Sequence, residues 1–326
     1  MKKTIFINFI FLILLILLIE FALRYIFSFN VQGISNNLIN LNNTDFRFNN
    51  PNLKNAKAFG VEVYTDKDGF RIKKDQIYKE EKKDILFVGG SVAFGPAIKA
   101  EDTFIGKLNS ISEYNIRNVS VFGTTFENNI QIIKNLKLKE NIKKIYISFP
   151  LDDIISNKVK IHTNSEIEDQ TLTQKLKRNK FVSYINLLIR SKSASYVFVK
   201  GLVSNPQDNN YIHDINLYKN KDLLKQLNIN LKKLEGLIDK TKIVFYSIPY
   251  AAQVKNNKCE TKDTSEKILK DIFGQNKYEI IFLHDDMCKN KKPLELFLKN
   301  DPVHLNKKGH NYIFKYFAKI IKNQNK

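Results

Sequence analysis

The sequence predicts an α/β fold: a three-layer α/β/α sandwich around a mainly parallel sheet of about five strands, preceded by a transmembrane helix. Three observations support this prediction. Short apolar runs alternate with longer amphipathic stretches through residues 85–322, which is typical of a parallel sheet covered on both faces. A glycine-serine turn follows the first apolar run, and a long apolar segment opens the chain.

Five apolar runs are short enough to be buried strands, and the stretches around them have helical periodicity. The expected strands are 85–88, 115–119, 144–149, 243–248 and 279–282. The expected helices are 103–111, 127–138, 223–239, 265–273 and 307–322. Residues from about 158 to 220 break this alternation, and we expect a helical insertion there that walls or covers the functional site.

Residues 1–28 are predicted to be an N-terminal transmembrane signal anchor. Residues 4–27 are almost wholly apolar, and about 20 such residues span a bilayer as a helix. A cleaved signal peptide is the alternative, but residues 27–30 make a poor cleavage site. Lys2 and Lys3 precede the helix, so the positive-inside tendency places the rest of the chain outside the cytoplasm, in a single-pass arrangement.

The remaining chain divides into a linker, 29–60, and a domain, 61–326. The linker is rich in asparagine and has little periodicity, so it reads as a connection or an ordered strap from membrane to domain. At the end of the apolar segment, Glu20 and Arg24 lie one helical turn apart and are expected to pair near the membrane interface.

The composition argues against nucleic-acid binding. The 326 residues carry a formal net charge of +20 and a pI of about 9.6. However, the lysines are spread along the whole chain, without an arginine-rich patch or an aromatic platform. We therefore expect affinity for anionic surfaces and no nucleic-acid partner.

The first predicted strand leads directly into Gly89-Gly90-Ser91, a tight turn at the end of the sheet where ligands of such folds gather. A phosphate-binding loop would need lysine where Pro96 stands. A hydrolase nucleophile elbow of the Gly-x-Ser-x-Gly type would need glycine where Ala93 stands. A plain structural turn is the remaining alternative.

A base for a nucleophilic serine is found near the C-terminus, where Asp301 precedes His304 by three residues at the expected start of the last helix. A serine needs a base to accept its proton, and the base needs a carboxylate to orient it. Residues three apart at a helix start can face each other. This pairing favours a catalytic function for Ser91 over a structural turn.

In four places, taken in order, the sequence resembles the SGNH (GDSL-type) hydrolase family. Residues 89–91 resemble its first block, 118–123 its second and 149–154 its third, and Asp301-x-x-His304 resembles its fifth. The resemblance extends from about residue 60 to the end and implies a flavodoxin-like sandwich. Glycine replaces the usual aspartate at position 90, while the serine is kept.

By this resemblance Ser91 is the nucleophile, His304 the general base and then the general acid, and Asp301 the residue that orients the imidazole. The oxyanion hole is expected from the backbone N–H groups of Ser91 and Gly123 and from the third block. There Asp152 stands where the family has asparagine. Asn128 and Asn129 are alternative donors for the oxyanion; the simpler interpretation, which we favour, is a polar pair at a helix start.

The implied activity is hydrolysis of an ester through an acyl-serine, without a cofactor or metal ion. The expected substrates are O-acyl, chiefly acetyl, groups of envelope polysaccharide or glycan. An O-acyltransferase of the same fold is one alternative, and a catalytically silent, membrane-tethered glycan-binding module is another, motivated by Asp152. The substrate's identity and the oligomeric state stay open.

Cys259 and Cys288 are the only cysteines. Since two cysteines in an exported domain tend to be oxidised, a disulfide between them is expected. Two unpaired buried thiols are the alternative.

Overall fold

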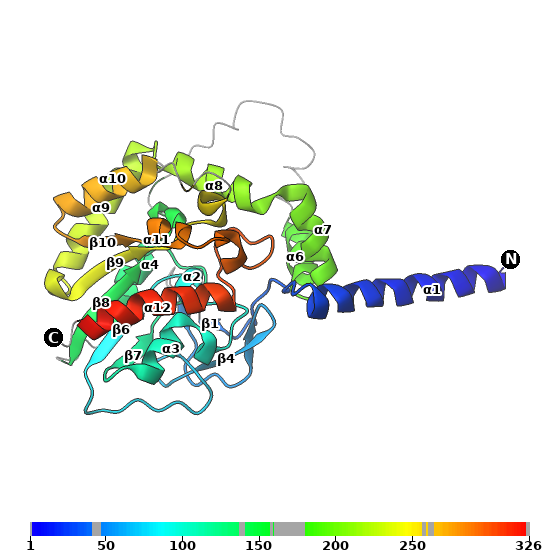
Figure 1. Cartoon of the computed structure of the whole chain (residues 1–326), viewed down its shortest axis with the longest axis horizontal. Helices are drawn as coiled ribbons and strands as arrows, with labels where there is room; N and C mark the ends of the chain where they lie inside the picture. The colour runs from blue at the N-terminus through cyan, green and yellow to red at the C-terminus, as the bar shows by residue number, and fades with distance from the viewer. Residues whose placement is uncertain are drawn as a thin grey trace.

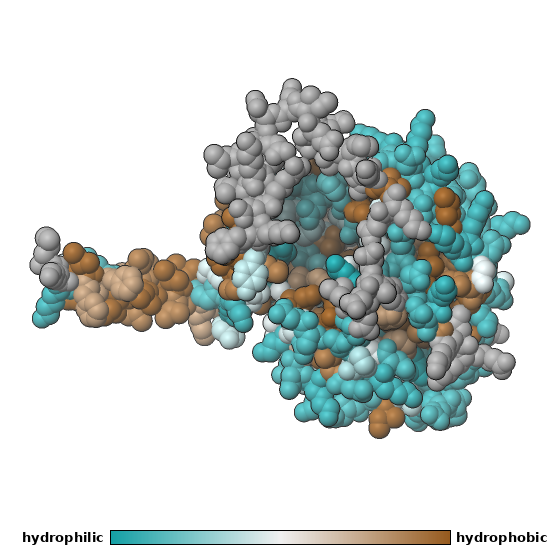
Figure 2. All heavy atoms as spheres, turned by 180° about the vertical axis from the view of Figure 1, so that it is seen from behind, coloured by the Kyte–Doolittle hydropathy of each residue, from teal (hydrophilic) through white to brown (hydrophobic). Residues whose placement is uncertain are grey.

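A computed structural model describes residues 2–40, 47–136, 141–156, 159, 180–255, 259 and 264–323. One long helix projects from an α/β domain (Figure 1). This helix, α1 (Lys2–Phe21), continues into a π-helical turn, η1 (Ala22–Ile26). Figure 2 shows hydrophobic side chains along its length, in contrast to the mainly hydrophilic domain surface. Within the described residues, it is the one helix long and apolar enough to cross a membrane.

The core of the domain is an eight-stranded sheet in the order β10-β9-β8-β6-β7-β5-β4-β3. Five strands are parallel: β6 (Asp84–Val88), β7 (Asn115–Asn118), β8 (Ile142–Ser148), β9 (Ile243–Ser247) and β10 (Glu279–Phe282). Three are antiparallel: β3 (Ala56–Ala58), β4 (Val61–Thr65) and β5 (Arg71–Ile72).

The parallel part of the sheet confirms the sequence prediction: all five expected strands are present, with ends within two residues. Counted along the chain, their spatial order is 2-1-3-4-5, the flavodoxin-like order. The first and third of them, β6 and β8, are neighbours, so the strand order reverses beside β6. Ligands of open α/β sheets bind at this reversal, and Ser91 follows β6 directly.

Helices cover both faces of the sheet (Figure 1). Alternate residues of β6 face opposite layers: Leu86 and Val88 belong to one core cluster, and Ile85 and Phe87 to the other. The first cluster includes residues of α4 (Phe126–Asn135), α9 (Lys221–Glu235) and α10 (Thr264–Gln275). The second includes residues of α3 (Phe104–Ile111), α11 (His284–Cys288) and α12 (Lys307–Asn323).

In the described part of residues 29–60 the segment is an ordered strap, one of the two alternatives that the sequence left open, and not a loose linker. β1 (Ile39–Asn40) pairs with β2 (Phe48–Asn49), and β3 extends the main sheet. Leu38, Ala56 and Ala58 are buried in a small core. Because these apolar side chains are few and separated by polar residues, the segment lacks the periodicity by which a packed strap could be recognised.

The predicted insertion is helical where the structure describes it. It contains α6 (Lys180–Arg190), α7 (Ala194–Ser204) and α8 (Pro206–Leu217), while residues 160–179 lie outside the described part. The remaining short helices are α2 (Ser91–Phe94), η2 (Ala100–Asp102), η3 (Leu151–Ile154), η5 (Lys240–Lys242), η6 (Ala251–Val254) and η8 (Pro293–Leu296).

Candidate active site

The turn that presents Ser91 is built from two glycines in confined positions. Strand β6 ends at Val88, and α2 begins at Ser91. A Cβ added at Gly89 would lie 2.6 Å from Cβ of Ser148 on the neighbouring strand β8. A Cβ added at Gly90 would lie 3.2 Å from the carbonyl oxygen of Thr124. The close approach of Ser148 therefore favours glycine at position 89, while the contact at position 90 is tight but could be relieved by a small shift.

Ser91, His304 and Asp301 form a hydrogen-bonded chain. Nε2 of His304 lies 2.8 Å from Oγ of Ser91. Nδ1 of the same ring lies 2.9 Å from each carboxylate oxygen of Asp301. Since a carboxylate only accepts, Nδ1 carries the proton and donates to Asp301, which leaves Nε2 to accept the serine proton. This is the arrangement that a serine nucleophile needs.

Asp301 and His304 face each other in a loop before α12, and not on its first turn as the sequence suggested. Oδ1 of Asp301 accepts backbone N–H bonds from Val303, at 3.0 Å, and from His304, at 2.8 Å. The carboxylate thus folds the loop around itself and fixes the histidine. Burial alone would raise the pKa of Asp301, but the charge of His304 and these hydrogen bonds hold the pKa below its usual value.

Two aromatic rings hold the imidazole in place. The edge of Phe59 meets the His304 ring at a centroid distance of 5.3 Å, and Phe122 stacks on it at 6.1 Å. Phe59 is buried and adopts a φ of +51°. Phe59 lies in the strap, residues 29–60. No sequence motif marks this residue as part of the site. Its left-handed conformation is unusual for a bulky residue, which indicates that packing determines its position.

Gly123 lies beside the serine turn, as the resemblance to the second block implies. The backbone N–H of Val121 donates to the carbonyl of Gly89 at 2.9 Å, which ties the two loops together. Gly123 has a φ of +72°, and a Cβ there would lie 2.7 Å from Nη1 of Arg47. That guanidinium nitrogen donates to the Gly123 carbonyl at 3.0 Å and so fixes the peptide orientation. The backbone N–H of Ser91, in the first turn of α2, has no partner within that helix.

Asp152 lies in η3, after β8, and its side chain is exposed. Surrounding protein nevertheless displaces much of the water around the carboxyl, and this desolvation, reinforced by the charge of Asp214, raises the pKa of Asp152. The hydroxyl of Tyr250 and the charge of His304 act in the opposite direction.

The helical insertion contributes a second carboxylate, Asp214, which acts on Asp152. Asp214 of α8 is buried and accepts a 2.7 Å hydrogen bond from the Tyr250 hydroxyl. Its other oxygen pairs with Nδ1 of the exposed His213 at 2.8 Å. Nothing in the sequence around position 214 signals this role, because the helix joins the site only through the tertiary fold.

The asparagines considered as substitutes for the third-block asparagine differ in burial. Asn129 is fully buried; its carbonyl accepts from the Thr124 hydroxyl at 3.4 Å. Its amide nitrogen has no hydrogen-bond partner among the described residues. Asn128 is half-buried on the first turn of α4. Burial of Asn129 away from solvent favours the interpretation of a structural helix-start pair.

Asp153, next to Asp152, is deeply buried beneath the site. Burial raises its pKa well above the usual value, and the charge of Asp152 adds to this. Its Oδ2 atom has no hydrogen-bond partner within the described part of the chain. A buried carboxyl without a partner for one oxygen strongly prefers the neutral form.

Arg71 supports the C-terminal end of α2, the helix that begins at Ser91. Its buried guanidinium donates to the carbonyls of Phe94 and Ile98 and, at 2.7 Å, of Gly95. Burial lowers its pKa to about 9. Phe94 ends α2, and Gly95 and Ile98 follow it, so Arg71 fixes the C-terminal end of the segment that begins at Ser91.

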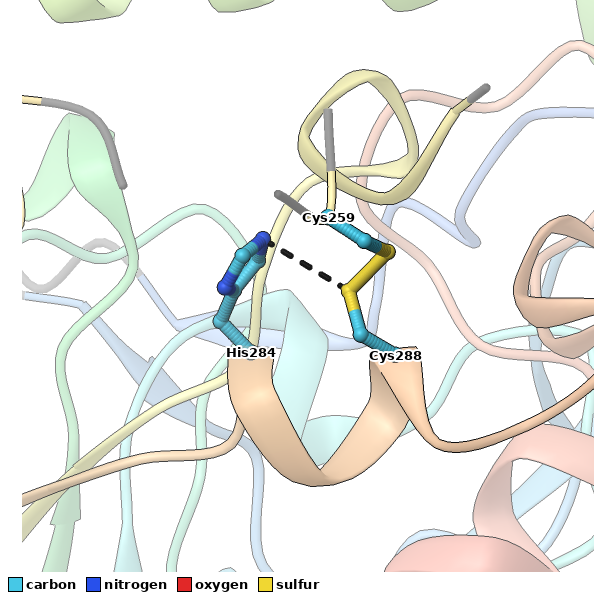
Figure 3. Close-up of side chains that lie close together, drawn as sticks. All are labelled: Cys259, His284 and Cys288. Atoms are coloured by element: carbon cyan, nitrogen blue, oxygen red, sulfur yellow. Dashed lines mark hydrogen bonds between the residues drawn. A yellow bond between two sulfur atoms is a disulfide. The ribbon is translucent and has the colours of Figure 1, made fainter. Parts of the chain in front are cut away.

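Cys259 and Cys288 are joined by a disulfide in the structure, and His284 lies beside them (Figure 3). Nε2 of His284 lies 3.7 Å from Sγ of Cys288 and 3.1 Å from the carbonyl oxygen of Gln253. Two cysteines and a histidine this close together resemble a set of metal ligands. However, cysteine binds a metal as a thiolate, and the two sulfur atoms here are joined in a disulfide. In this oxidised form the three residues make a structural link.

No protein-family model matches the chain, and no curated protein matches it. Among solved structures, it is similar to a lipase/acylhydrolase from Enterococcus faecalis, with 13% identity, a TM-score of 0.43, and coverage of 74% of this chain and 96% of that one. It is also similar to a catalytic mutant of an acetylxylan esterase from Geobacillus stearothermophilus, with 13% identity, a TM-score of 0.40, and coverage of 73% and 94%. A member of the lipolytic protein G-D-S-L family from Veillonella parvula gives 12% identity, a TM-score of 0.36, and coverage of 71% and 94%. The three solved structures named here are thus a lipase/acylhydrolase, an acetylxylan esterase and a lipolytic protein of the G-D-S-L family.

Proposed function

We propose that this protein is a membrane-anchored serine ester hydrolase of the SGNH type. The single observation that carries the proposal is the hydrogen-bonded chain from Ser91 through His304 to Asp301 at the strand-order reversal of the sheet. That arrangement supplies a nucleophile, a base and an orienting carboxylate at the place where α/β folds bind ligands.

In the proposed reaction, Nε2 of His304 takes the proton from Oγ of Ser91 as the oxygen attacks the ester carbonyl. A tetrahedral intermediate forms, and its negative oxygen is held by the backbone N–H groups of Ser91 and Gly123. His304 then protonates the leaving alcohol, and an acyl-serine remains. Water, activated by His304, attacks this ester and releases the acid.

In this proposal, the protonation state of Asp152 limits the rate of ester hydrolysis. A neutral carboxyl can donate a hydrogen bond to the oxyanion, as an asparagine does, whereas an ionised carboxylate repels it. The raised pKa of Asp152 makes the neutral fraction at a given pH larger than that of an ordinary aspartate. We therefore expect weak esterase activity that falls as the carboxyl ionises.

The proposed location is the outer side of a membrane, with α1 as a single-pass anchor. Support comes from the apolar span Lys3–Ile26 and from Lys2 and Lys3 before it. The proposed substrates are O-acyl, chiefly acetyl, groups on envelope polysaccharide or glycan. The net charge of +20 favours anionic polymers among them.

A serine-directed fluorophosphonate probe tests the proposal. Wild type should be labelled, Ser91→Ala should not, and Ser110→Ala, a change of an exposed serine, should react like wild type. Equal labelling of wild type and Ser91→Ala would remove Ser91 as the nucleophile. An unreactive but folded wild type would favour the second candidate, a glycan-binding module without catalysis, which the carboxylate at position 152 motivates.

An O-acyltransferase is the alternative within the same chemistry, since a sugar hydroxyl can replace water as acceptor. Incubation with a labelled acetyl donor and an unacetylated glycan separates the two. Release of free acetate supports the hydrolase, and transfer of label to the glycan supports the transferase.

A further inference from the structure

We propose that helices α6 and α7 form a membrane-docking surface that rests on the bilayer beside the anchor helix. This proposal rests on α1 being the membrane anchor proposed above. The surface consists of the outward-facing apolar side chains of the two helices: Tyr184, Ile185, Leu187, Leu188, Ile189, Val199, Leu202 and Val203, all exposed.

Helix α6 is turned the opposite way from an ordinary surface helix. Its polar side faces the protein: Oδ1 of Asn186 accepts from the Tyr196 hydroxyl at 2.7 Å, and Nε of Arg190 donates to Gln32 at 2.7 Å. Its apolar side faces outward, with Leu187 56% exposed. A helix in water buries the apolar face and exposes the polar one. This inversion indicates that the outer face is covered by something apolar.

Helix α7 follows the same pattern. Ala194 and Val197 are buried against the protein, while Leu202 and Val203 on the opposite face are 66% and 85% exposed. With α6, these residues make a patch well beyond the isolated exposed side chains of an ordinary surface.

The occupant is identified by where the patch lies. The carboxylate of Glu20, at the end of α1, accepts backbone N–H bonds from Ala194, at 2.8 Å, and Ser195, at 2.9 Å, in the first turn of α7. Arg24 pairs with Glu20 at 2.6 Å and also donates to the carbonyl of Lys192. The start of α7 is thus fixed to the end of the apolar span.

The orientation fits a bilayer. In Figure 1, α6 and α7 run across the direction of α1, at the base from which α1 projects. If α1 crosses the membrane, helices lying across it at its exit lie along the membrane surface. The exposed apolar side chains of Tyr25, Ile26 and Phe27 continue the patch toward α1. Interfacial helices bury such a face at the boundary between headgroups and acyl chains.

Docking would also hold the catalytic loop close to the membrane. A Cβ added at Gly201 of α7 would collide with the side chain of Asn300, the neighbour of Asp301. Nε2 of Gln207 donates to the Asp301 carbonyl at 3.2 Å. Lys299 lies over the ring of Phe29, 5.4 Å from its centroid. The triad loop therefore packs on α7, which would touch the lipid, and on its neighbours, the start of α8 and the segment that follows η1.

Single tryptophans test the docking, because the chain has none of its own. Full-length Leu187→Trp and Leu202→Trp are reconstituted into phosphatidylcholine–phosphatidylglycerol vesicles, with or without bromine on the acyl chains. Ile77→Trp, at an isoleucine 89% exposed on a loop of the domain, is the matched control. Phe9→Trp reports the anchor itself. Circular dichroism, which does not depend on catalysis, checks that each variant is folded.

Docking predicts blue-shifted emission and at least a twofold loss of fluorescence with brominated lipid for both helix variants, and neither change for Ile77→Trp. Solvent-like, unquenched emission at both helix positions would overturn it. Blue-shifted emission without bromine quenching would also overturn it, because a protein and not lipid would then cover the patch. If Phe9→Trp is not quenched, the proposed anchor fails, and the helix variants still report docking separately.

Discussion

The buried hydroxyl of Tyr250 donates a 2.7 Å hydrogen bond to Asp214, and both residues act on the carboxyl of Asp152. Asp152 lies where the resembling family has an amide. Burial and the neighbouring negative charge of Asp214 disfavour ionisation of the Asp152 carboxyl and bias it toward its neutral form, while the Tyr250 hydroxyl acts in the opposite direction. In its neutral form Asp152 can donate a hydrogen bond to the oxyanion, whereas an ionised aspartate would repel it.

Asp152→Asn should raise turnover of a short aryl acetate, by as much as ~100-fold if a permanent donor is restored. The pH profile gives a second test. In wild type, the neutral fraction of a carboxyl with a raised pKa falls as pH rises through that pKa, so activity should decline on the alkaline side. Asp152→Asn should lack this decline. If wild type reacts with the fluorophosphonate probe but Asp152→Asn shows no higher turnover, Asp152 does not limit the rate.

Asp214→Asn should move the alkaline decline to lower pH. Removal of the negative charge lowers the pKa of Asp152, so that carboxyl ionises earlier and activity at neutral pH falls. The measurement is the pH dependence of kcat/KM. In the Asp152→Asn background, Asp214→Asn should leave the profile unshifted, whereas an equal shift in both backgrounds would show that Asp214 acts independently of Asp152.

Asp153→Asn should change how stability depends on pH. A carboxyl with a raised folded-state pKa contributes stability that is fully present below its unfolded pKa, about 3.9. That contribution is lost as pH rises through the folded pKa. Wild type should therefore lose stability upward from about pH 4, and Asp153→Asn should remove this component. Urea unfolding at several pH values measures it, with the exposed Asp75→Asn as control. Parallel curves for wild type and Asp153→Asn would contradict the prediction.

Reduction of the Cys259–Cys288 disulfide should lower the free energy of unfolding by about 3–4 kcal/mol on the chain-entropy model, given a sequence separation of 29. The double variant Cys259→Ser, Cys288→Ser should show the same loss and be insensitive to reductant. Thiol titration of the unfolded, unreduced protein should find no free thiol, and two free thiols would rule the link out.

The parallel strands, and the meeting of Ser91, His304 and Asp301 in space, could be predicted from the sequence for physical reasons. Strands buried on both faces are continuous apolar runs, and the serine turn needs glycines at fixed positions. The short strands β3, β4 and β5 lack such runs. The contact of Phe59 with His304 and the approach of Asp214 to Asp152 join segments far apart in the chain, so no local pattern encodes them.

The loop of Asp301 and His304 shows the same limit on a smaller scale. Their spacing predicts that the two side chains meet, and they do. The spacing suggests a helix start, but the backbone N–H bonds of Val303 and His304 to the carboxylate make a loop instead. A residue pair can therefore be predicted while the local structure that joins it is not.

The most direct test of the central claim is to trap the acyl-enzyme. Full-length protein is mixed with a chromogenic acetate ester, quenched in acid during turnover, digested and examined by mass spectrometry. The account predicts one acetyl group on the peptide that contains Ser91, absent from Ser91→Ala and retained in Ser110→Ala. Turnover that continues in Ser91→Ala, or an acetyl group that accumulates only on another residue, would contradict it.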